Sequence, residues 1–162
     1  MNAIKDSIHG YIELCPAAEA ILDTTQMQRL RYVKQLSTVQ LVYPSANHTR
    51  FEHSLGVYHL ASKAVEKLDI DEDLKKRIRI AALVHDTGHG PFGHQTEAAI
   101  ERHLGRHHDE IEWLLSDTEL GDAIETCGLD TEAVAESVDG RGPLGELVSG
   151  AIDVDRMDYL VR

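Results

Sequence analysis

The sequence predicts an all-α fold, a helical bundle in one domain with a small β-hairpin feature at its N-terminal end. Two observations support this prediction. After the first 14 residues, apolar side chains recur at the three- and four-residue spacing of helices. Glycine and proline form a linker-like cluster only in residues 139–145. A chain of 162 residues with 42% apolar residues is sufficient for one sizeable core.

The N-terminal element is predicted to be a short strand or hairpin over residues 6–14, because apolar and polar side chains alternate after Gly10. A helix is predicted over residues 25–35, because its apolar residues fall at helical spacing. Residues 39–43 stand directly before Pro44, which disfavours helix in the residue that precedes it. We expect a loop or an extended piece there.

Two longer helices are predicted at the centre of the fold. The first begins at Thr49, which forms a capping box with Glu52, and ends near Asp69. The second follows the acidic run 71–73, which is favourable at the positive end of a helix dipole. This second helix places His85 at the end of a buried stripe.

Shorter helices complete the predicted bundle. Gly88 and Gly90 end the preceding helix, and Pro91 suits the first position of the next one, which runs to Leu104. Further helices are predicted over residues 110–115, 120–127 and 131–138. The last segment, residues 146–162, is apolar enough to pack back on the rest.

Charge and composition exclude several classes of protein. The net charge is −12, and residues 91–162 hold 5 basic and 17 acidic groups, against 11 of each in residues 1–90. We therefore expect no strong nucleic-acid binding. The chain has no apolar run long enough to cross a membrane and no basic leader, and its two cysteines are far apart. These features predict a cytoplasmic protein with reduced thiols and no membrane role.

Ten histidines are a high count for this length, and several of them are grouped. Imidazoles and carboxylates together form ligand sets for Zn, Mn, Fe, Ni or Co. A thiolate-rich structural zinc site is not expected with only two distant cysteines.

The central motif is the run His-Asp-Thr-Gly-His-Gly-Pro-Phe-Gly-His over residues 85–94. Neighbouring side chains on a helix point about 100° apart, so His85 and Asp86 can share one ion only near a helix end, which Gly88 supplies. With His53 and a carboxylate from the last segment, such a set could hold one divalent ion and leave positions for water and a phosphate oxygen. The competing interpretation is that His85 is a satisfied core histidine, which is more common for a lone histidine on an apolar face.

The segments Thr-Arg-Phe-Glu-His-Ser-Leu-Gly-Val at 49–57 and Ile-Asp-Val-Asp-Arg-Met-Asp-Tyr at 152–159 favour the metal-binding interpretation. Together with residues 6–14, 28–36 and 85–94, they make the chain resemble the HD-domain metal-dependent phosphohydrolases, in the branch of deoxynucleoside triphosphate triphosphohydrolases. The resemblance covers nearly the whole chain. It implies a single HD domain over residues 1–162, which we expect to be the N-terminal catalytic part of a longer family architecture.

The resemblance also implies roles for individual residues. The implied metal ligands are His53, His85, Asp86 and Asp155, with Asp153 as the alternative to Asp155. The implied catalytic and phosphate-contacting residues are His89, His94, Glu97 and His108, with His107 as the alternative to His108. Substrate would be bound by Arg50 and Arg156 at the phosphates, by Gln35 and Leu36 at the sugar, and by Tyr159 in the same pocket. Asp23, Gln28 and Arg31 match a possible effector-nucleotide site, although Asn2 stands where a relative has a phosphate-binding lysine.

The predicted reaction is attack on a nucleotide phosphorus by a water that one divalent metal ion activates. The ion would be Fe, Mn, Ni, Co or Zn, and Mg could accompany the nucleotide phosphates. In the family this chemistry releases a nucleoside and intact triphosphate, and the enzymes act as homo-oligomers. Two alternatives stay open: a phosphodiesterase or nucleotidase acting on other phosphate esters, and a regulatory module that binds nucleotides without catalysis.

Overall fold

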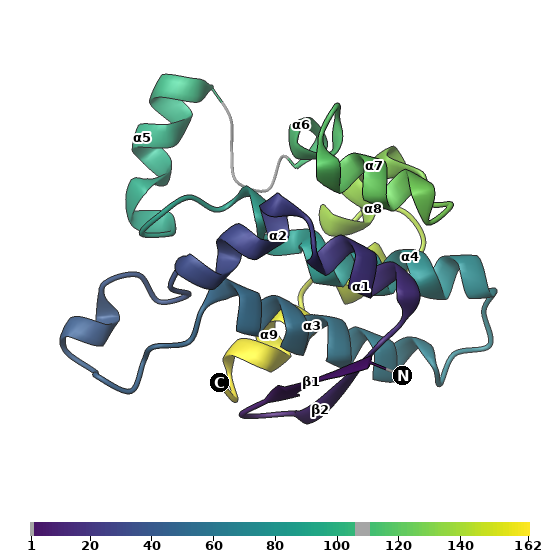
Figure 1. Cartoon of the computed structure of the whole chain (residues 1–162), viewed down its shortest axis with the longest axis horizontal. Helices are drawn as coiled ribbons and strands as arrows, with labels where there is room; N and C mark the ends of the chain where they lie inside the picture. Colours follow the sequence, from purple (N-terminus) through teal and green to yellow (C-terminus); the bar gives the residue numbers. More distant parts are fainter. Residues whose placement is uncertain (1, 106–110) are drawn as a thin grey trace.

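The computed structural model describes residues 2–105 and 111–162, and it confirms the all-α class with a small N-terminal hairpin (Figure 1). The strands are β1 (Asn2–Asp6) and β2 (Gly10–Leu14). The helices are α1 (Pro16–Leu22), α2 (Thr25–Arg29), α3 (Arg50–Val65), α4 (Glu72–Val84), α5 (His94–Leu104), α6 (Glu112–Leu115), α7 (Glu119–Thr126), α8 (Thr131–Val138) and α9 (Val154–Tyr159). Short 3-10 turns cover Leu30–Tyr32, Val39–Leu41, His85–Gly88 and Gly145–Leu147.

The hairpin is held by its own turn and by the core. β1 and β2 pair antiparallel with Ile4 opposite Ile12, and Ile12 is fully buried. One carboxylate oxygen of Asp6 accepts hydrogen bonds from the backbone N–H groups of Ile8 (3.0 Å) and His9 (2.9 Å). This local bonding by an Asp side chain fixes the turn that carries His9.

Helices α3 and α4 pack side by side at the centre of the fold (Figure 1). The predicted capping box is present: the hydroxyl of Thr49 accepts from the backbone N–H of Glu52, and the Glu52 carboxylate accepts from that of Thr49 at 2.6 Å. Asp71 caps α4 by accepting from the N–H of Leu74 at 2.8 Å. The two predicted central helices are therefore confirmed, together with the signals that start them, but the first ends at Val65 rather than near Asp69.

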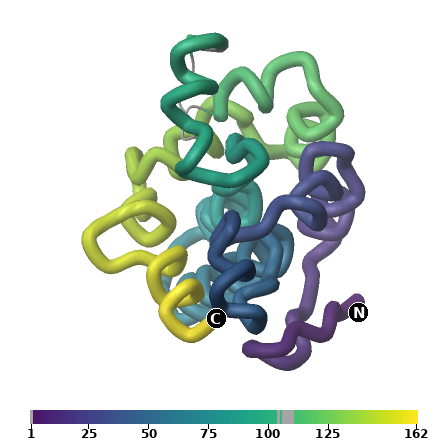
Figure 2. Tube along the Cα trace, turned by 90° about the vertical axis from the view of Figure 1, so that its left-hand side faces the viewer, coloured from purple at the N-terminus to yellow at the C-terminus, as the bar shows by residue number. Residues whose placement is uncertain are grey.

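The last described segment returns to the centre, as predicted. Helix α9 packs against α3, and Figure 2 shows the yellow C-terminal turns beside the blue part of the trace. Asp158 on α9 is fully buried at this contact. The packing joins residues that are about 100 positions apart in the sequence.

The first strand begins at Asn2 rather than at Asp6, and two further predicted boundaries are wrong. The helix expected over residues 25–35 ends at Arg29 and continues only as a 3-10 turn, because Val33 is extended and its carbonyl accepts from the N–H of Arg50 at 2.8 Å. Pairing with the start of α3 thus replaces helix formation. Helix α1, which begins at Pro16, was not predicted from the sequence.

The second wrong boundary concerns Pro91, which lies in a turn while α5 begins at His94. Phe92 and Gly93 adopt positive φ angles of 66° and 50°, which cannot continue a right-handed helix. The residues predicted as a loop or extended piece before Pro44 contain a short 3-10 turn.

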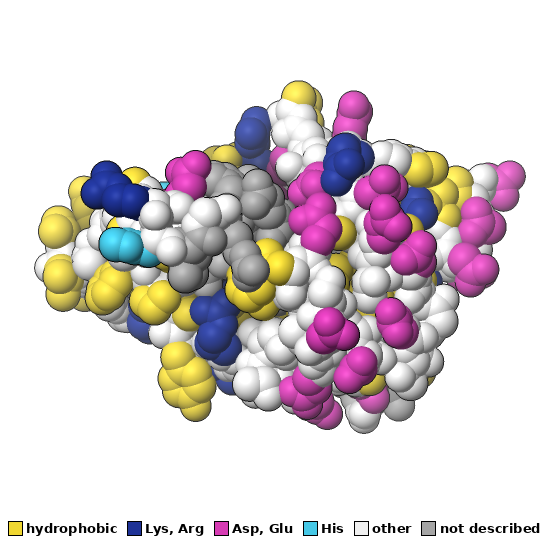
Figure 3. Space-filling view, turned by 90° about the horizontal axis from the view of Figure 1, so that it is seen from above, with side chains coloured by type: hydrophobic (Ala, Val, Ile, Leu, Met, Phe, Trp, Pro, Cys, Tyr) yellow, Lys and Arg dark blue, Asp and Glu magenta, His cyan; other side chains and the backbone are white. Residues whose placement is uncertain are grey.

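Acidic side chains gather on the right-hand part of the face in Figure 3, over the region of α6 to α8. The exposed acids on or beside these helices include Glu112, Glu119, Asp122, Glu125, Asp130 and Glu132. Among the described residues, no helix is both long and apolar enough to cross a lipid bilayer.

Candidate metal centre

The end of α4 presents the adjacent His85 and Asp86. The helix stops at Val84, and the following four residues form a 3-10 turn. The Nδ1 atom of His85 lies 2.9 Å from the carbonyl oxygen of Ala82, so the ring is held from behind and Nε2 is left for another partner. Asp86 is buried beside it. The change of helix type at this point lets two consecutive side chains approach one place.

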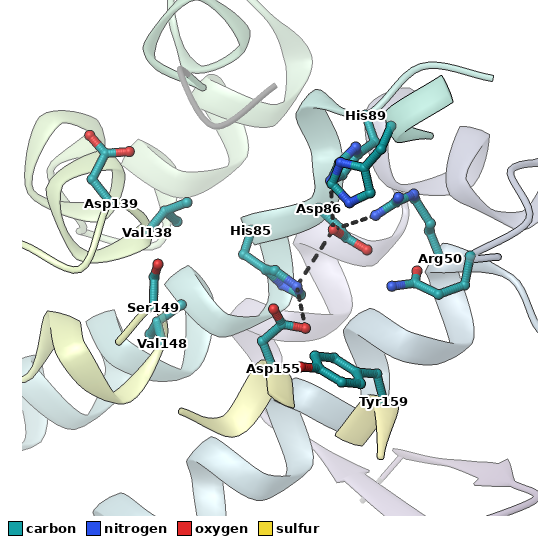
Figure 4. Close-up of a pocket in the computed structure, with 12 residues that line it drawn as sticks. Arg50, His85, Asp86, His89, Val138, Asp139, Val148, Ser149, Asp155 and Tyr159 are labelled. Carbon is teal, nitrogen blue, oxygen red and sulfur yellow. Dashed lines mark hydrogen bonds and ion pairs between the residues drawn. The ribbon is translucent and has the colours of Figure 1, made fainter. Parts of the chain in front are cut away.

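Helices α3 and α9 bring further side chains to the same place, and Figure 4 shows Asp155 of α9 beside His85. His53 on α3 is fully buried, and its Nε2 lies 2.8 Å from a carboxylate oxygen of Asp155 on α9. The Nε2 of His85 lies 3.6 Å from Asp86 and 3.9 Å from Asp155. The candidate ligand atoms of His53, His85 and Asp86 all lie within 4.8 Å of one another. The structure therefore brings together the four side chains that the resemblance implies as ligands.

The chemistry of these atoms fits a divalent metal ion. Nε2 of His85 and Oδ2 of Asp86 are buried without a hydrogen-bond partner, and Nε2 of His53 meets only the carboxylate of Asp155, itself an implied ligand. A buried polar atom without a partner costs about 1–3 kcal/mol, so two such atoms in one place call for a common partner. Imidazole nitrogens and carboxylate oxygens are suitable ligands for first-row divalent metals. This group of side chains could hold such an ion.

The charged side chains of the site shift one another's pKa values. Burial acts to raise the pKa of the Asp86 carboxyl, but the charges of His85 and Arg50 outweigh it, and the pKa lies well below its ordinary range. Burial acts to lower the pKa of His53, whereas Asp155 and Asp158 raise it to about 9. A metal ion bound at Nε2 of His53 would have to displace a proton from that nitrogen.

A second cluster adjoins the first and contains His89, His94 and Glu97. The Nε2 of His89 lies 3.4 Å from Asp86, and its Nδ1 lies 3.4 Å from Glu97. The Nδ1 of His94 lies 2.6 Å from the same Glu97 oxygen, and the two histidine rings meet edge to face at 5.1 Å. The positive φ angles at Phe92 and Gly93 turn the chain so that His94 faces back toward His89.

Arg50 connects this cluster to the metal-binding group. Its guanidinium is buried and donates from Nη1 to Asp86 at 2.7 Å. It also lines a cavity of about 340 Å³ together with Gln35 and Tyr159. A neighbouring cavity of about 470 Å³ shares these three side chains and adds Leu36. Four of the five implied substrate contacts, Gln35, Leu36, Arg50 and Tyr159, thus line these two neighbouring cavities.

Other implied residues lie elsewhere. Arg156 is exposed on α9, bonds the carbonyl oxygen of Ala151 at 2.7 Å, and lines neither cavity. Gln28 and Arg31 come together, with Nε of Arg31 donating to the Gln28 side chain at 2.8 Å. Asp23 ends α1, and none of these three residues lines the two cavities. His107 and His108 lie outside the described residues.

Several side chains at the site were not predicted to have a role. The wall opposite Tyr159 in Figure 4 is formed by Val138, Asp139, Val148 and Ser149. Asp153, the alternative ligand, caps α9 by accepting from the N–H of Arg156 at 2.7 Å, so it does not face His53. No local sequence pattern marks the opposite wall, because its residues come from the end of α8 and from the segment after the 3-10 turn Gly145–Leu147.

Arg29 and Asp158 support the site from outside. Arg29 donates from Nη1 to the carbonyl oxygen of His89 (2.9 Å) and from Nη2 to that of Thr87 (2.7 Å), and so braces the backbone after Asp86. Asp158 lies 2.7 Å from Nδ1 of His53. The sequence contained no signal for Arg29, and it offered Asp158 only as one of three nearby aspartates.

Comparisons with known proteins identify the family of the chain. The family model described as "HD domain" matches residues 50–162. An uncharacterized protein of Methanocaldococcus jannaschii is 40% identical over 162 residues, which cover all of this chain and 33% of that protein. The deoxynucleoside triphosphate triphosphohydrolase SAMHD1 of Homo sapiens is 35% identical over 207 residues, covering 100% of this chain and 33% of that protein.

The SAMHD1 homolog of Dictyostelium discoideum is 36% identical over 183 residues, covering 98% of this chain and 35% of that protein. The chain thus spans about a third of the length of these curated relatives. A crystal structure of a hypothetical protein from Aquifex aeolicus superposes with a TM-score of 0.86 at 36% identity, over 98% of this chain and 44% of that one. On this evidence the chain belongs to the HD domain family.

Proposed function

We propose that the chain is a metal-dependent phosphohydrolase that cleaves deoxynucleoside triphosphates into nucleoside and triphosphate. The observation that carries the proposal is the convergence of ligand atoms of His53, His85 and Asp86, beside Asp155 and next to a hollow lined by Arg50. The likeness to SAMHD1 proteins over the whole chain supports this choice of substrate.

His53, His85, Asp86 and Asp155 would hold the ion. When bound, a divalent ion lowers the pKa of a bound water and neutralises charge that develops on a phosphate. Arg50 would bind a phosphate oxygen of the substrate with the guanidinium nitrogens that Asp86 does not use. Arg156 has no contact with either cavity, so its implied contact with the substrate phosphates stays a prediction.

His89, His94 and Glu97 would carry out the proton transfer to or from the leaving oxygen. Glu97 lies within reach of both histidines, and a carboxylate in this position orients an imidazole for general acid–base catalysis. His94 is the more exposed of the two and stands at the start of α5, where it can reach a leaving oxygen. His108 stays a prediction as an alternative proton carrier.

The test is product analysis. The protein, reconstituted with Mn²⁺ or Fe²⁺, is incubated with each of the four deoxynucleoside triphosphates, and the products are separated by chromatography. We expect nucleoside and triphosphate from the wild type and none from His85→Ala or Asp86→Ala. His103→Ala and Asp69→Ala change exposed residues of the same types away from the site and serve as matched controls.

Each other outcome has a defined meaning. Release of phosphate or pyrophosphate would contradict the proposed triphosphohydrolase activity. It would favour a phosphodiesterase or nucleotidase that acts on other phosphate esters. Metal binding at one ion per chain without turnover of any nucleotide would contradict catalysis by this chain alone and favour the nucleotide-binding module.

We also propose that the protein forms a homo-oligomer. Apolar side chains are strongly exposed on the segment before α3, including Tyr32 (88%), Leu41 (79%) and Val42 (75%). Large exposed apolar side chains close together are typical of protein interfaces. Light scattering coupled to gel filtration measures the mass directly, and a monomer at all concentrations would contradict the prediction. The cytoplasmic location stays a prediction as well.

A further inference from the structure

Behind the candidate metal centre, a closed set of hydrogen bonds joins the N-terminal hairpin to α9. Asp158 stands at its middle and is fully buried. Its Oδ2 lies 2.7 Å from Nδ1 of His53 and accepts from Nε of Arg162 at 2.8 Å. Its Oδ1 lies 2.6 Å from Nε2 of His9 and accepts from Nη2 of Arg162 at 3.1 Å. Donors therefore surround both oxygens of one carboxylate.

The position of His9 is fixed from several directions. Its backbone N–H donates to Asp6, which shapes the hairpin turn. Asp6 in turn accepts from Nη1 of Arg162 at 2.9 Å. The ring of His9 packs against that of His59 with the centroids 5.2 Å apart, and its side chain is 10% exposed. The hairpin thus fixes the position of Nε2 of His9 beside Asp158.

This arrangement determines which nitrogen of His53 is available. An ionised carboxylate only accepts hydrogen bonds, so Nδ1 of His53 must carry the hydrogen that it shares with Asp158. In a neutral imidazole the lone pair then lies on Nε2, which faces Asp155 and Asp86. A carboxylate behind a metal-binding histidine fixes both the tautomer and the orientation of the ring.

We propose that His9 is a positioning residue of the metal centre. By holding Oδ1 of Asp158, it keeps Oδ2 in line with Nδ1 of His53 and so keeps Nε2 of His53 directed at the ion. Without His9, Oδ1 would retain only the longer bond from Arg162, and the carboxylate could rotate away from His53. The inference rests on the proposed function, because it assumes that the four implied ligands bind a metal.

The experiment measures metal affinity rather than turnover alone. In His9→Phe a ring remains against His59 but the donor is lost, whereas in His9→Gln a donor is retained. His59→Phe is the matched control, because His59 contacts the ring of His9 and has no bond to Asp158. For each protein, Co²⁺ affinity is measured by competition with a chelator, and the visible absorption spectrum of bound Co²⁺ reports the ligand geometry.

We expect His9→Phe to weaken Co²⁺ binding about 10–100-fold and to change the visible spectrum. The KM for nucleotide at saturating metal should stay unchanged, because His9 lines neither of the two cavities at the proposed substrate site. His9→Gln should recover most of the affinity, and His59→Phe should match the wild type. In an Asp158→Asn background, His9→Phe should cause no further loss, since both act through the same carboxylate.

The failures of the two proposals are distinguishable. A wild type that binds no Co²⁺ would contradict the metal centre and with it the proposed function. A wild type that binds one Co²⁺, together with unchanged affinity and spectrum in His9→Phe, would overturn the role of His9 alone. Equal losses in His59→Phe and His9→Phe would assign the effect to ring packing and overturn it too. If His9→Phe does not fold, His9→Asn is used instead, because the asparagine side chain is too short to reach Asp158. The same results would then support or overturn the role of His9.

Discussion

Single side chains set the charge balance at the metal centre, and Arg50 is the clearest case. It is buried at the start of α3, and one guanidinium nitrogen neutralises Asp86 while the group also lines the hollow. A lysine at this position would keep the charge but lose the planar fork that can hold a carboxylate and a phosphate together.

We therefore expect Arg50→Lys to reduce kcat about 100-fold or more. Removal of one hydrogen-bond donor that stabilises the charge of the transition state has an effect of this size. Steady-state kinetics with deoxynucleoside triphosphates measure this, and thermal unfolding checks that the fold persists. Arg102→Lys, an exposed change on α5, is the control. Wild-type kcat in Arg50→Lys would contradict a role for the fork in catalysis.

Some residues of the site could be predicted from sequence and others could not, for a physical reason. His85 and Asp86 are adjacent and stand where helical periodicity ends, so a local pattern marks them. The partners His9 and Asp158 are 149 positions apart, and their hydrogen bond exists only after folding. The resemblance supplied Asp155 as a ligand, but spacing alone did not separate it from Asp153 or Asp158.

At the scale of elements, the 3-10 turn after α4 is braced by a neighbouring helix. Arg29 of α2 donates to the backbone carbonyl of Thr87 in the turn and to that of His89 directly after it. Burial acts to lower the pKa of Arg29, and the nearby charge of Arg50 acts in the same direction. The turn is thus braced by the guanidinium of an otherwise exposed arginine.

We expect Arg29→Gln to lower the free energy of unfolding by roughly 1–3 kcal/mol, because buried carbonyl groups lose their partners. It should also lower kcat, since His89 would no longer be held. Urea unfolding and kinetics measure the two effects. Arg79→Gln, which removes a surface ion pair with Glu66, should cost less than about 1 kcal/mol. Equal costs for the two variants would contradict the bracing role.

Element boundaries also show where sequence patterns fail. Thr49 and Glu52 marked the start of α3 correctly, because a capping box acts within one turn of chain. Helical periodicity failed over residues 25–35, because pairing of Val33 with Arg50 competes with the helix. Pro91 suited a helix start, but the positive φ of Phe92 depends on folded contacts such as the bond from Ser37 to its carbonyl oxygen.

At the scale of the whole molecule, the packing of α9 on α3 assembles the centre. Gly56 lies where the two helices meet, and a Cβ atom there would overlap the carboxylate of Asp158 and the guanidinium of Arg162. The glycine is required because of this close approach.

We expect Gly56→Ala to lower the free energy of unfolding by about 1–3 kcal/mol, the usual cost of overpacking, and to weaken metal binding at the same time. Urea unfolding and Co²⁺ competition measure both quantities. Lys63→Ala on the exposed side of the same helix should change stability by less than about 0.5 kcal/mol. Full metal affinity in a folded Gly56→Ala protein would contradict the link between helix packing and the site.

The bond between His9 and Asp158 has a consequence for the order of events during synthesis. When residues 85 and 86 leave the ribosome, the chain holds three of the four implied ligands, but the carboxylate that orients His53 has not yet been made. Closing such a long loop is entropically costly and comes late in folding. A nascent chain without Asp158 would therefore capture metal only weakly, and tight binding of an ion would have to wait until His9 and Asp158 have met.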